Sequence, residues 1–148
     1  MILDINNINI SKNIITGKFT GILSEDTDDS IGCLNIKYEN INITYNQSLH
    51  DCLDGFAIKG AHETTITDTI ISYNKSTDPL GYTVNGICVT PHTKNSKMLY
   101  IDNCKIIYNS AHADATNENN HIAGIYLQAV HECEISETES NFNSGNGQ

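Results

Sequence analysis

Gly55-Phe-Ala-Ile-Lys-Gly-Ala-His-Glu-Thr-Thr-Ile-Thr-Asp-Thr69 is matched, position by position, by Gly124-Ile-Tyr-Leu-Gln-Ala-Val-His-Glu-Cys-Glu-Ile-Ser-Glu-Thr138. Two further segments fit the same pattern, a longer one over residues 86–104 and a shorter one over residues 32–46. Repeats of this length are typical of solenoids, in which each unit buries its apolar face only against its neighbours. The repeated unit, more than any single motif, therefore decides the fold.

Apolar residues alternate at the start of each unit, which is the period of a strand with one buried face. The alternating pairs that we expect to point inward are Phe56/Ile58, Ile87/Val89 and Ile125/Leu127. Stacked units would place each strand about 4.8 Å from the one above it. The pattern predicts an all-β parallel solenoid of about five coils that forms one domain over residues 1–148. Residues 1–30 would be a degenerate first coil, and residues 31–148 would hold the repeats.

Each unit ends on an aromatic residue followed by asparagine. The four pairs are Tyr45-Asn46, Tyr73-Asn74, Tyr108-Asn109 and Phe142-Asn143. Asparagine tolerates the left-handed conformation and hydrogen-bonds nearby backbone in turns, and like residues in stacked coils form amide ladders. We therefore expect a structural ladder of asparagines at these positions, with no part in catalysis.

The pattern of glycine, alternating apolar residues, a turn, Ile-x-Asp/Glu and aromatic-Asn resembles the right-handed parallel β-helix repeats of the pectate-lyase-like superfamily. The resemblance covers about residues 31–145, and it implies carbohydrate-binding or sugar-hydrolase type repeats. Such coils occur in lyases, hydrolases, epimerases, tailspikes and non-catalytic scaffolds, so the resemblance is specific for the fold and weak for the activity.

The amino-acid composition narrows the classes of function that this chain can have. Eight lysines, no arginine and 18 acidic residues give a formal net charge of -10, which disfavours a nucleic-acid partner. No apolar run approaches the length of a membrane span, and no signal peptide is recognisable. The five cysteines show no CxxC spacing, and we interpret them as reduced core residues, which fits a reducing compartment or a fragment. The chain reads as a segment of a longer solenoid and leaves its localisation undetermined.

In the resembling proteins the outward residues of the first strand form the floor of a substrate groove. The corresponding residues here are Ala57, Lys59, Cys88, Thr90, Tyr126 and Gln128. Lys59 and Tyr126 can move a proton or hold a negative oxygen, so they are candidate catalytic residues. Thr90 and Gln128 are candidate substrate-binding residues, together with Asp54 and Asp114 from the neighbouring loops. The alternative is an ordinary solvated sheet face with solvated loop charges.

Histidine follows this strand in three units. His62, His92 and His131 lie 7, 6 and 7 residues after their glycines, which predicts a ladder of imidazoles. His92 is the candidate catalytic member, and His62 and His131 are candidates for substrate binding. No carboxylate pair or cysteine completes a tetrahedral set, so we predict no metal site and no cofactor, with weak Ca²⁺ or Zn²⁺ binding as the open alternative. The ladder can also be a simple consequence of stacked identical turns.

Pro91-His92 resembles part of the Tyr-Gly-Phe-Asp-Pro-His motif of mannuronan epimerases and related alginate lyases. Thr90 stands where that motif has its catalytic aspartate, and Ile87 stands where it has tyrosine. The leading hypothesis is therefore a protein that recognises a polysaccharide or glycan, as part of a depolymerase or tailspike-like protein. A non-catalytic structural or adhesive scaffold is the first alternative and a uronate epimerase or lyase the second. Open solenoid ends would favour a homo-oligomer or continuation of the solenoid.

Overall fold

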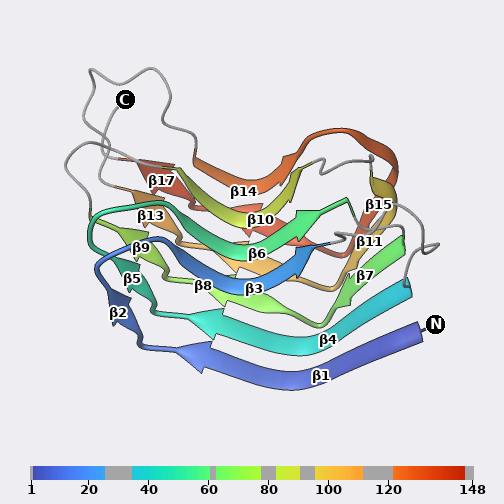
Figure 1. Ribbon diagram of the computed structural model, residues 1–148, viewed down its shortest axis with the longest axis horizontal. Helices are drawn as coiled ribbons and strands as arrows, with labels where there is room; N and C mark the ends of the chain where they lie inside the picture. Colours follow the sequence, from blue (N-terminus) through green and yellow to red (C-terminus); the bar gives the residue numbers. More distant parts are fainter. Residues whose placement is uncertain are drawn as a thin grey trace.

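The computed structural model describes residues 2–25, 35–60, 63–77, 83–90, 96–111 and 122–145. These ranges form an all-β parallel solenoid, as the repeat predicts (Figure 1). They contain only strands and their connections, so none of them forms an apolar helix that could cross a bilayer.

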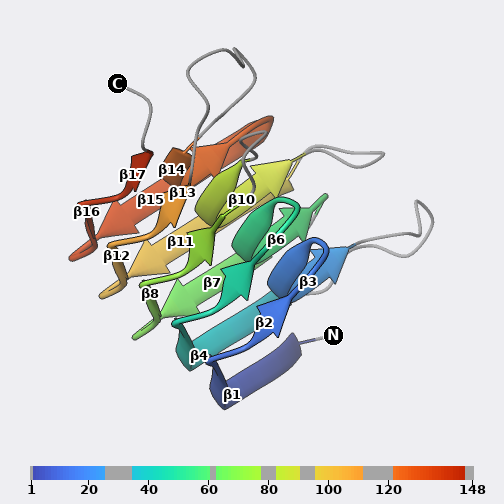
Figure 2. The same ribbon diagram turned by 90° about the vertical axis from the view of Figure 1, so that its left-hand side faces the viewer.

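Three parallel sheets run along the stack of turns (Figure 2). Within the described ranges the first is four-stranded, with the strands β3 (Phe19–Glu25), β6 (Leu53–Lys59), β10 (Val84–Thr90) and β14 (Ile122–Leu127). The second is five-stranded, with β2 (Ile14–Ile15), β5 (Gln47–Ser48), β9 (Lys75–Ser76), β13 (Ser110–Ala111) and β17 (Ser144–Gly145). The third is eight-stranded, with β1 (Ile2–Ser11), β4 (Asn35–Thr44), β7 (Glu63–Thr67), β8 (Ile70–Ser72), β11 (Ser96–Asp102), β12 (Lys105–Ile107), β15 (Val130–Ser136) and β16 (Glu139–Asn141).

The number of turns is smaller than the sequence predicted. About three full turns separate β3 from β14 in the four-stranded sheet, where about five coils were expected. The repeat count gave one coil to each of the five passes through the eight-stranded sheet, from β1 to β15. The four-stranded sheet has four described strands and therefore three intervals, because no described strand follows β17.

The register confirms the predicted inward residues. Phe56 lies opposite Ile87, and Ile58 lies opposite Val89, and all four side chains are buried at the core. In β14 the partners of Ile87 and Val89 are Ile125 and Leu127. Leu127 is 37 % exposed, because within the described ranges no further strand lies on β14. The core is therefore complete in the middle turns and opens toward the end of the stack.

A glycine bends each strand of the four-stranded sheet. A Cβ atom on Gly55 would lie 2.6 Å from the carbonyl oxygen of Gly86 and 2.6 Å from Cγ2 of Ile71, so no larger residue fits there. The glycine stacked before Gly55 is Gly21, since a Cβ on Gly21 would meet the Gly55 carbonyl oxygen. The sequence alignment had placed Gly32 in that position. This part of the alignment was wrong, because an alternating apolar pattern alone does not tell which sheet a strand joins.

The predicted asparagine ladder is present. Asn46 Nδ2 donates to Asn74 Oδ1 at 3.0 Å, Asn74 Nδ2 donates to Asn109 Oδ1 at 2.9 Å, and Asn109 Nδ2 donates to Asn143 Oδ1 at 3.0 Å. The sequence missed its first member, Asn13, whose Nδ2 donates to Asn46 Oδ1 at 2.9 Å. The ladder ties five successive passes of the chain together, so its role is structural as expected.

In each of the four aromatic-asparagine pairs the left-handed residue is the aromatic one, contrary to the expectation that the asparagine adopts this conformation. The φ angles of Tyr45, Tyr73, Tyr108 and Phe142 are 57°, 56°, 57° and 52°. Consecutive rings of this aromatic column are parallel, with centroids 4.9, 5.0 and 4.9 Å apart. Positive φ is costly for a bulky residue. The ring stacking and the asparagine hydrogen bonds hold these residues in that conformation.

Candidate functional site

A polar hollow of about 260 Å³ lies on the outer face of the four-stranded sheet. Figure 1 shows that β3, β6, β10 and β14 all curve, so that this sheet is concave. The hollow is lined by outward side chains from both sides of the glycine bend: Lys18, Cys52, Asp54, Thr83, Asn85, Cys88, Thr90, Tyr126 and Gln128. We call this surface the groove hollow.

Four predicted substrate or catalytic residues lie together in the groove hollow. They are Asp54, Thr90, Tyr126 and Gln128, which come from three neighbouring strands and the residue after the last of them. Thr90 is in register with Lys59. Gln128 follows β14, and its backbone N–H donates to the carbonyl oxygen of Val89 at 2.8 Å. The expectation that outward residues of successive turns share one surface is met at these positions.

Lys59 does not line the hollow. Its Nζ lies 3.6 Å from Glu25 Oε2 on the neighbouring strand β3, where the two residues are opposite each other. The charge of this candidate catalytic lysine is therefore engaged in an ion pair along the stack.

Asp54 is the charged centre of the groove hollow. Its side chain is buried, and Oδ2 lies 3.2 Å from Lys18 Nζ while Oδ1 accepts a hydrogen bond of 2.9 Å from Asn85 Nδ2. Partial burial lowers the pKa of Lys18, but attraction to Asp54 and their hydrogen bond outweigh this effect, so the pKa of Lys18 is raised. Lys18 and Asp54 form an ion pair, and the pair adds no net charge to the hollow.

The sequence missed Lys18, Cys52, Thr83 and Asn85. Lys18 and Cys52 come one residue before the inward pair Phe19 and Leu53, and Asn85 lies opposite Asp54. The alternation that identified the floor after each glycine also holds before it. Its phase shifts by one residue at the glycine, since the inward residues Leu53 and Phe56 are three positions apart. Extended upstream without that shift, the alternation would have assigned these residues to the core, although their side chains occupy the outer face.

Two thiols line the groove hollow as neutral groups. Burial, reinforced by the negative charge of Asp54, raises the pKa of Cys88 to about 11. Burial also raises the pKa of Cys52. Neither thiol is a thiolate nucleophile at neutral pH. The expectation that the cysteines are core residues holds for Cys104 alone among the described ones, because Cys52 and Cys88 are half-buried and Cys133 is exposed.

The predicted histidine ladder is only partly within the described residues. His62 and His92 lie outside them, as does Asp114, so their predicted roles remain predictions. His131 is exposed in β15. Its neighbour in β11 is Lys97, since Ser96 pairs with Val130 and Met98 pairs with Glu132. The sequence spacing implied His92 at this position. Five residues separate β10 from β11 and two separate β14 from β15, so equal spacing from the glycine does not give equal register.

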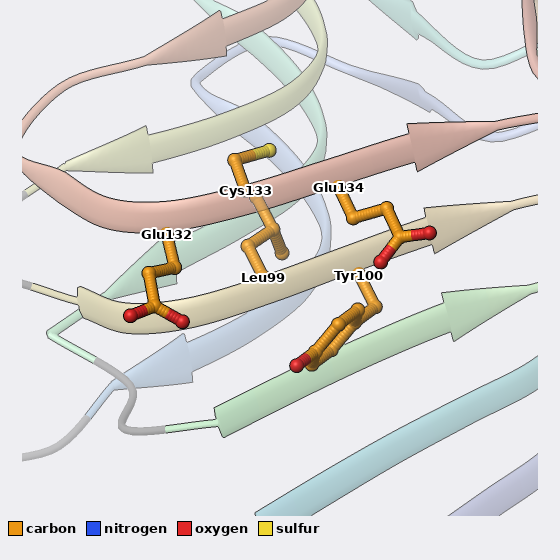
Figure 3. A pocket seen from close by; sticks show the side chains of 5 residues that line it. All are labelled: Leu99, Tyr100, Glu132, Cys133 and Glu134. Carbon is orange, nitrogen blue, oxygen red and sulfur yellow. The ribbon is translucent and has the colours of Figure 1, made fainter.

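A second, smaller hollow of about 190 Å³ lies over β11 and β15 (Figure 3). It is lined by Leu99, Tyr100, Glu132, Cys133 and Glu134. Across the described ranges no three histidine, cysteine or acidic side chains gather in a way that could hold a metal ion. Both faces of these strands contribute to the lining, so the hollow lies along β15, which is an end strand of the eight-stranded sheet.

No family model, curated protein or solved structure matches this chain. The parallel solenoid is therefore established by the structure alone. The resemblance to the pectate-lyase-like superfamily stays a hypothesis that rests on the repeat pattern.

Proposed function

We propose that this protein binds carbohydrate, with the groove hollow as its site and a pectate-lyase-like β-helix as its ancestry. The observation that carries the proposal is the gathering of hydroxyl, amide and phenol groups in one concave surface on the outer face of the four-stranded sheet. Such groups are the donors and acceptors that match sugar hydroxyls. The native context would be a polysaccharide-degrading or tailspike-like protein.

The charges of the site favour an uncharged sugar. Lys18 and Asp54 compensate each other at 3.2 Å, and the two thiols are neutral, so the described lining offers no net positive charge. A uronate would also approach a chain with a formal net charge of -10 that has no arginine to hold its carboxylate. The ligand class that fits is therefore a neutral glycan.

The size of the hollow favours a single sugar unit. Its volume of about 260 Å³ is below the roughly 300–1,000 Å³ of sites for drug-sized ligands. A polymer would place one unit in the hollow and extend over the same sheet face.

Recognition without turnover is the form of the function that the described groups support best. Asp54 is the carboxylate of the hollow, and it is already engaged by Lys18 and Asn85. Thr90, at the position where the epimerase motif has aspartate, brings a hydroxyl group to the hollow. Glycoside hydrolysis requires a pair of carboxyl groups across the bond. Catalysis by Lys59, His92 and Tyr126 would show as release of reducing ends or of unsaturated sugar from a bound glycan.

A glycan array followed by calorimetry tests the proposal. We expect binding to at least one neutral glycan, weakened roughly 5- to 10-fold in Gln128→Ala and in Thr90→Ala, the cost of one lost hydrogen bond. Thr65→Ala is the matched control, because Thr65 lies in β7 of the eight-stranded sheet, away from the hollow. Absence of binding to every glycan at millimolar concentration would leave the non-catalytic scaffold as the function. Equal affinity of the three variants for the glycan would show that the binding site lies outside the groove hollow.

A further inference from the structure

Both ends of the solenoid present unpaired strands. Among the described strands β1, β2 and β3 have a neighbour on one side only at the first turn, and β14, β15, β16 and β17 have a neighbour on one side only at the last. Unpaired edges of this kind are templates for pairing with another chain. The two edges lie at opposite ends of one parallel stack. Strands of a second copy that is stacked end to end in the same orientation would therefore run parallel to the strands of the first.

The apolar core is open at both ends. One column of inward residues runs through all passes of the eight-stranded sheet: Ile5, Tyr38, Ile66, Ile101 and Ile135. Ile66 and Ile101 in the middle are fully buried, whereas Ile135 at the last turn is 47 % exposed. At the first turn Leu3 is 44 % exposed. Both ends therefore offer apolar surface that the same stacking would cover.

The asparagine ladder gives the two ends opposite hydrogen-bonding character. Each asparagine donates through its backbone N–H and Nδ2 to the Oδ1 of the next one. Within the described ranges Asn13 Oδ1 receives no donor, and the backbone N–H of Asn143 finds no acceptor. The first turn thus ends in an acceptor and the last turn in a donor. A head-to-tail contact satisfies both, whereas two like ends would bring acceptor to acceptor or donor to donor.

The aromatic column has matching ends as well. Its last ring, Phe142, is 63 % exposed, and among the described rings it stacks on Tyr108 alone. Lys12 occupies the equivalent position of the first turn, directly before Asn13, with a φ of 60° like that of the aromatic residues. An ammonium group over an aromatic face is a favourable contact.

We propose that copies of this chain stack head to tail, with the last turn of one copy on the first turn of the next. The contact joins unlike surfaces and does not close, so it generates open linear assemblies. The eight-stranded and five-stranded sheets would continue through the joint, while the four-stranded sheet would lack one strand there. Asp4 of one copy would lie opposite Glu134 of the next, since both belong to the column of Lys37, Thr65 and Tyr100.

Cross-linking tests the orientation. Leu3 and Cys133 belong to one inward column, through Ile36, Thr64 and Leu99. In the stack Leu3 of one copy lies opposite Cys133 of the next at about 4.8 Å, the spacing of neighbouring strands, within the range that a disulfide spans. Oxidised Leu3→Cys should therefore form a ladder of covalent oligomers through Cys133, mapped by peptide mass spectrometry. Asp4→Cys is the control, because its side chain faces the other side of β1.

Two cross-linking results would overturn the proposal. One is a Leu3→Cys protein that forms no more covalent oligomer than Asp4→Cys. The other is a product joined only between Cys133 of two copies, which shows a tail-to-tail contact.

Sedimentation of the unmodified protein gives the independent test. The weight-average mass should rise with concentration beyond that of a dimer. It should rise further at 0.5 M salt, because salt screens the repulsion between Asp4 and Glu134 at the joint. Ile135→Lys should abolish the rise. Ile70→Lys should retain it, since Ile70 is similarly exposed at 41 % but lies in β8 within the stack. Matching circular dichroism spectra would show that both variants fold. A mass that stays at the monomer, or saturates at the dimer, contradicts head-to-tail stacking.

Discussion

The asparagine ladder makes a sharp prediction for Asn74, which lies at its centre and is fully buried. Asn74→Ala removes four hydrogen bonds. Its Nδ2 no longer donates to Asn109 Oδ1 and to the carbonyl oxygen of Ile43, both at 2.9 Å. Its Oδ1 no longer accepts from the backbone N–H and the Nδ2 of Asn46, at 3.1 and 3.0 Å.

The expected loss of unfolding free energy is about 3–5 kcal/mol, because each bond contributes about 0.5–1.5 kcal/mol and the stranded buried partners cost more. Asn13→Ala is the matched control. It is the same substitution at the exposed end of the ladder, where the side chain makes one of these bonds, Asn13 Nδ2 to Asn46 Oδ1 at 2.9 Å. That change should cost only about 0.5–1 kcal/mol.

Urea unfolding followed by circular dichroism and tyrosine fluorescence measures both variants. The reasoning is refuted if the two variants unfold within about 1 kcal/mol of each other. It would also fail if Asn74→Ala kept the stability of the wild type.

Three further predictions concern the glycine bend, the aromatic column and the thiols. Gly55→Ala should destabilise the fold by about 2–3 kcal/mol through overpacking, whereas Gly17→Ala, whose Cβ would meet no atom within 4 Å, should be neutral or slightly stabilising in thermal melts. Tyr73→Ala breaks two stacked ring contacts and Tyr45→Ala breaks one, so chemical denaturation should show about twice the loss for Tyr73, at about 0.5–1.5 kcal/mol per pair. The raised pKa of Cys88, about 11, means that the folded state holds this proton more tightly than the unfolded state. Stability should therefore fall as pH rises from about 9 to about 11, and Cys88→Ala should make that fall shallower in pH-dependent unfolding.

The fold was readable from the sequence because each stacked turn repeats the same physical requirement. A glycine is needed wherever the bent strand approaches the carbonyl oxygen of the next, as at Gly55. An asparagine is needed wherever a buried amide must bond the turns on both sides, as at Asn74. The same residue types therefore recur at the same positions of each repeat unit.

The sequence predictions were wrong where the structure depends on features that the repeat pattern does not contain. Alternation marks a strand but not the sheet to which it belongs, so Gly32 was aligned where the structure has Gly21. Turn length changes register without changing the motif, so Lys97 and not His92 lies opposite His131. The last repeat looks like a full unit in sequence, although no described strand of the four-stranded sheet follows β17.

Only part of the candidate site could be predicted from the sequence, because the repeat pattern does not show which residues of different turns come into contact. Thr90, Tyr126 and Gln128 follow the glycine on the face that alternation assigns to solvent, and they line the groove hollow. The ion pair between Lys18 and Asp54 joins residues that are far apart in sequence, and only the stacking of turns brings them together.

Amide NMR of the protein, titrated with the neutral glycan that binds best on the array, tests the proposed site most directly. The proposal predicts shifts that saturate together at Asn85, Thr90, Tyr126 and Gln128, with Ser76 of the five-stranded sheet unmoved. Shifts that cluster on another face, or a spectrum unchanged at millimolar glycan, would contradict carbohydrate recognition in the groove hollow.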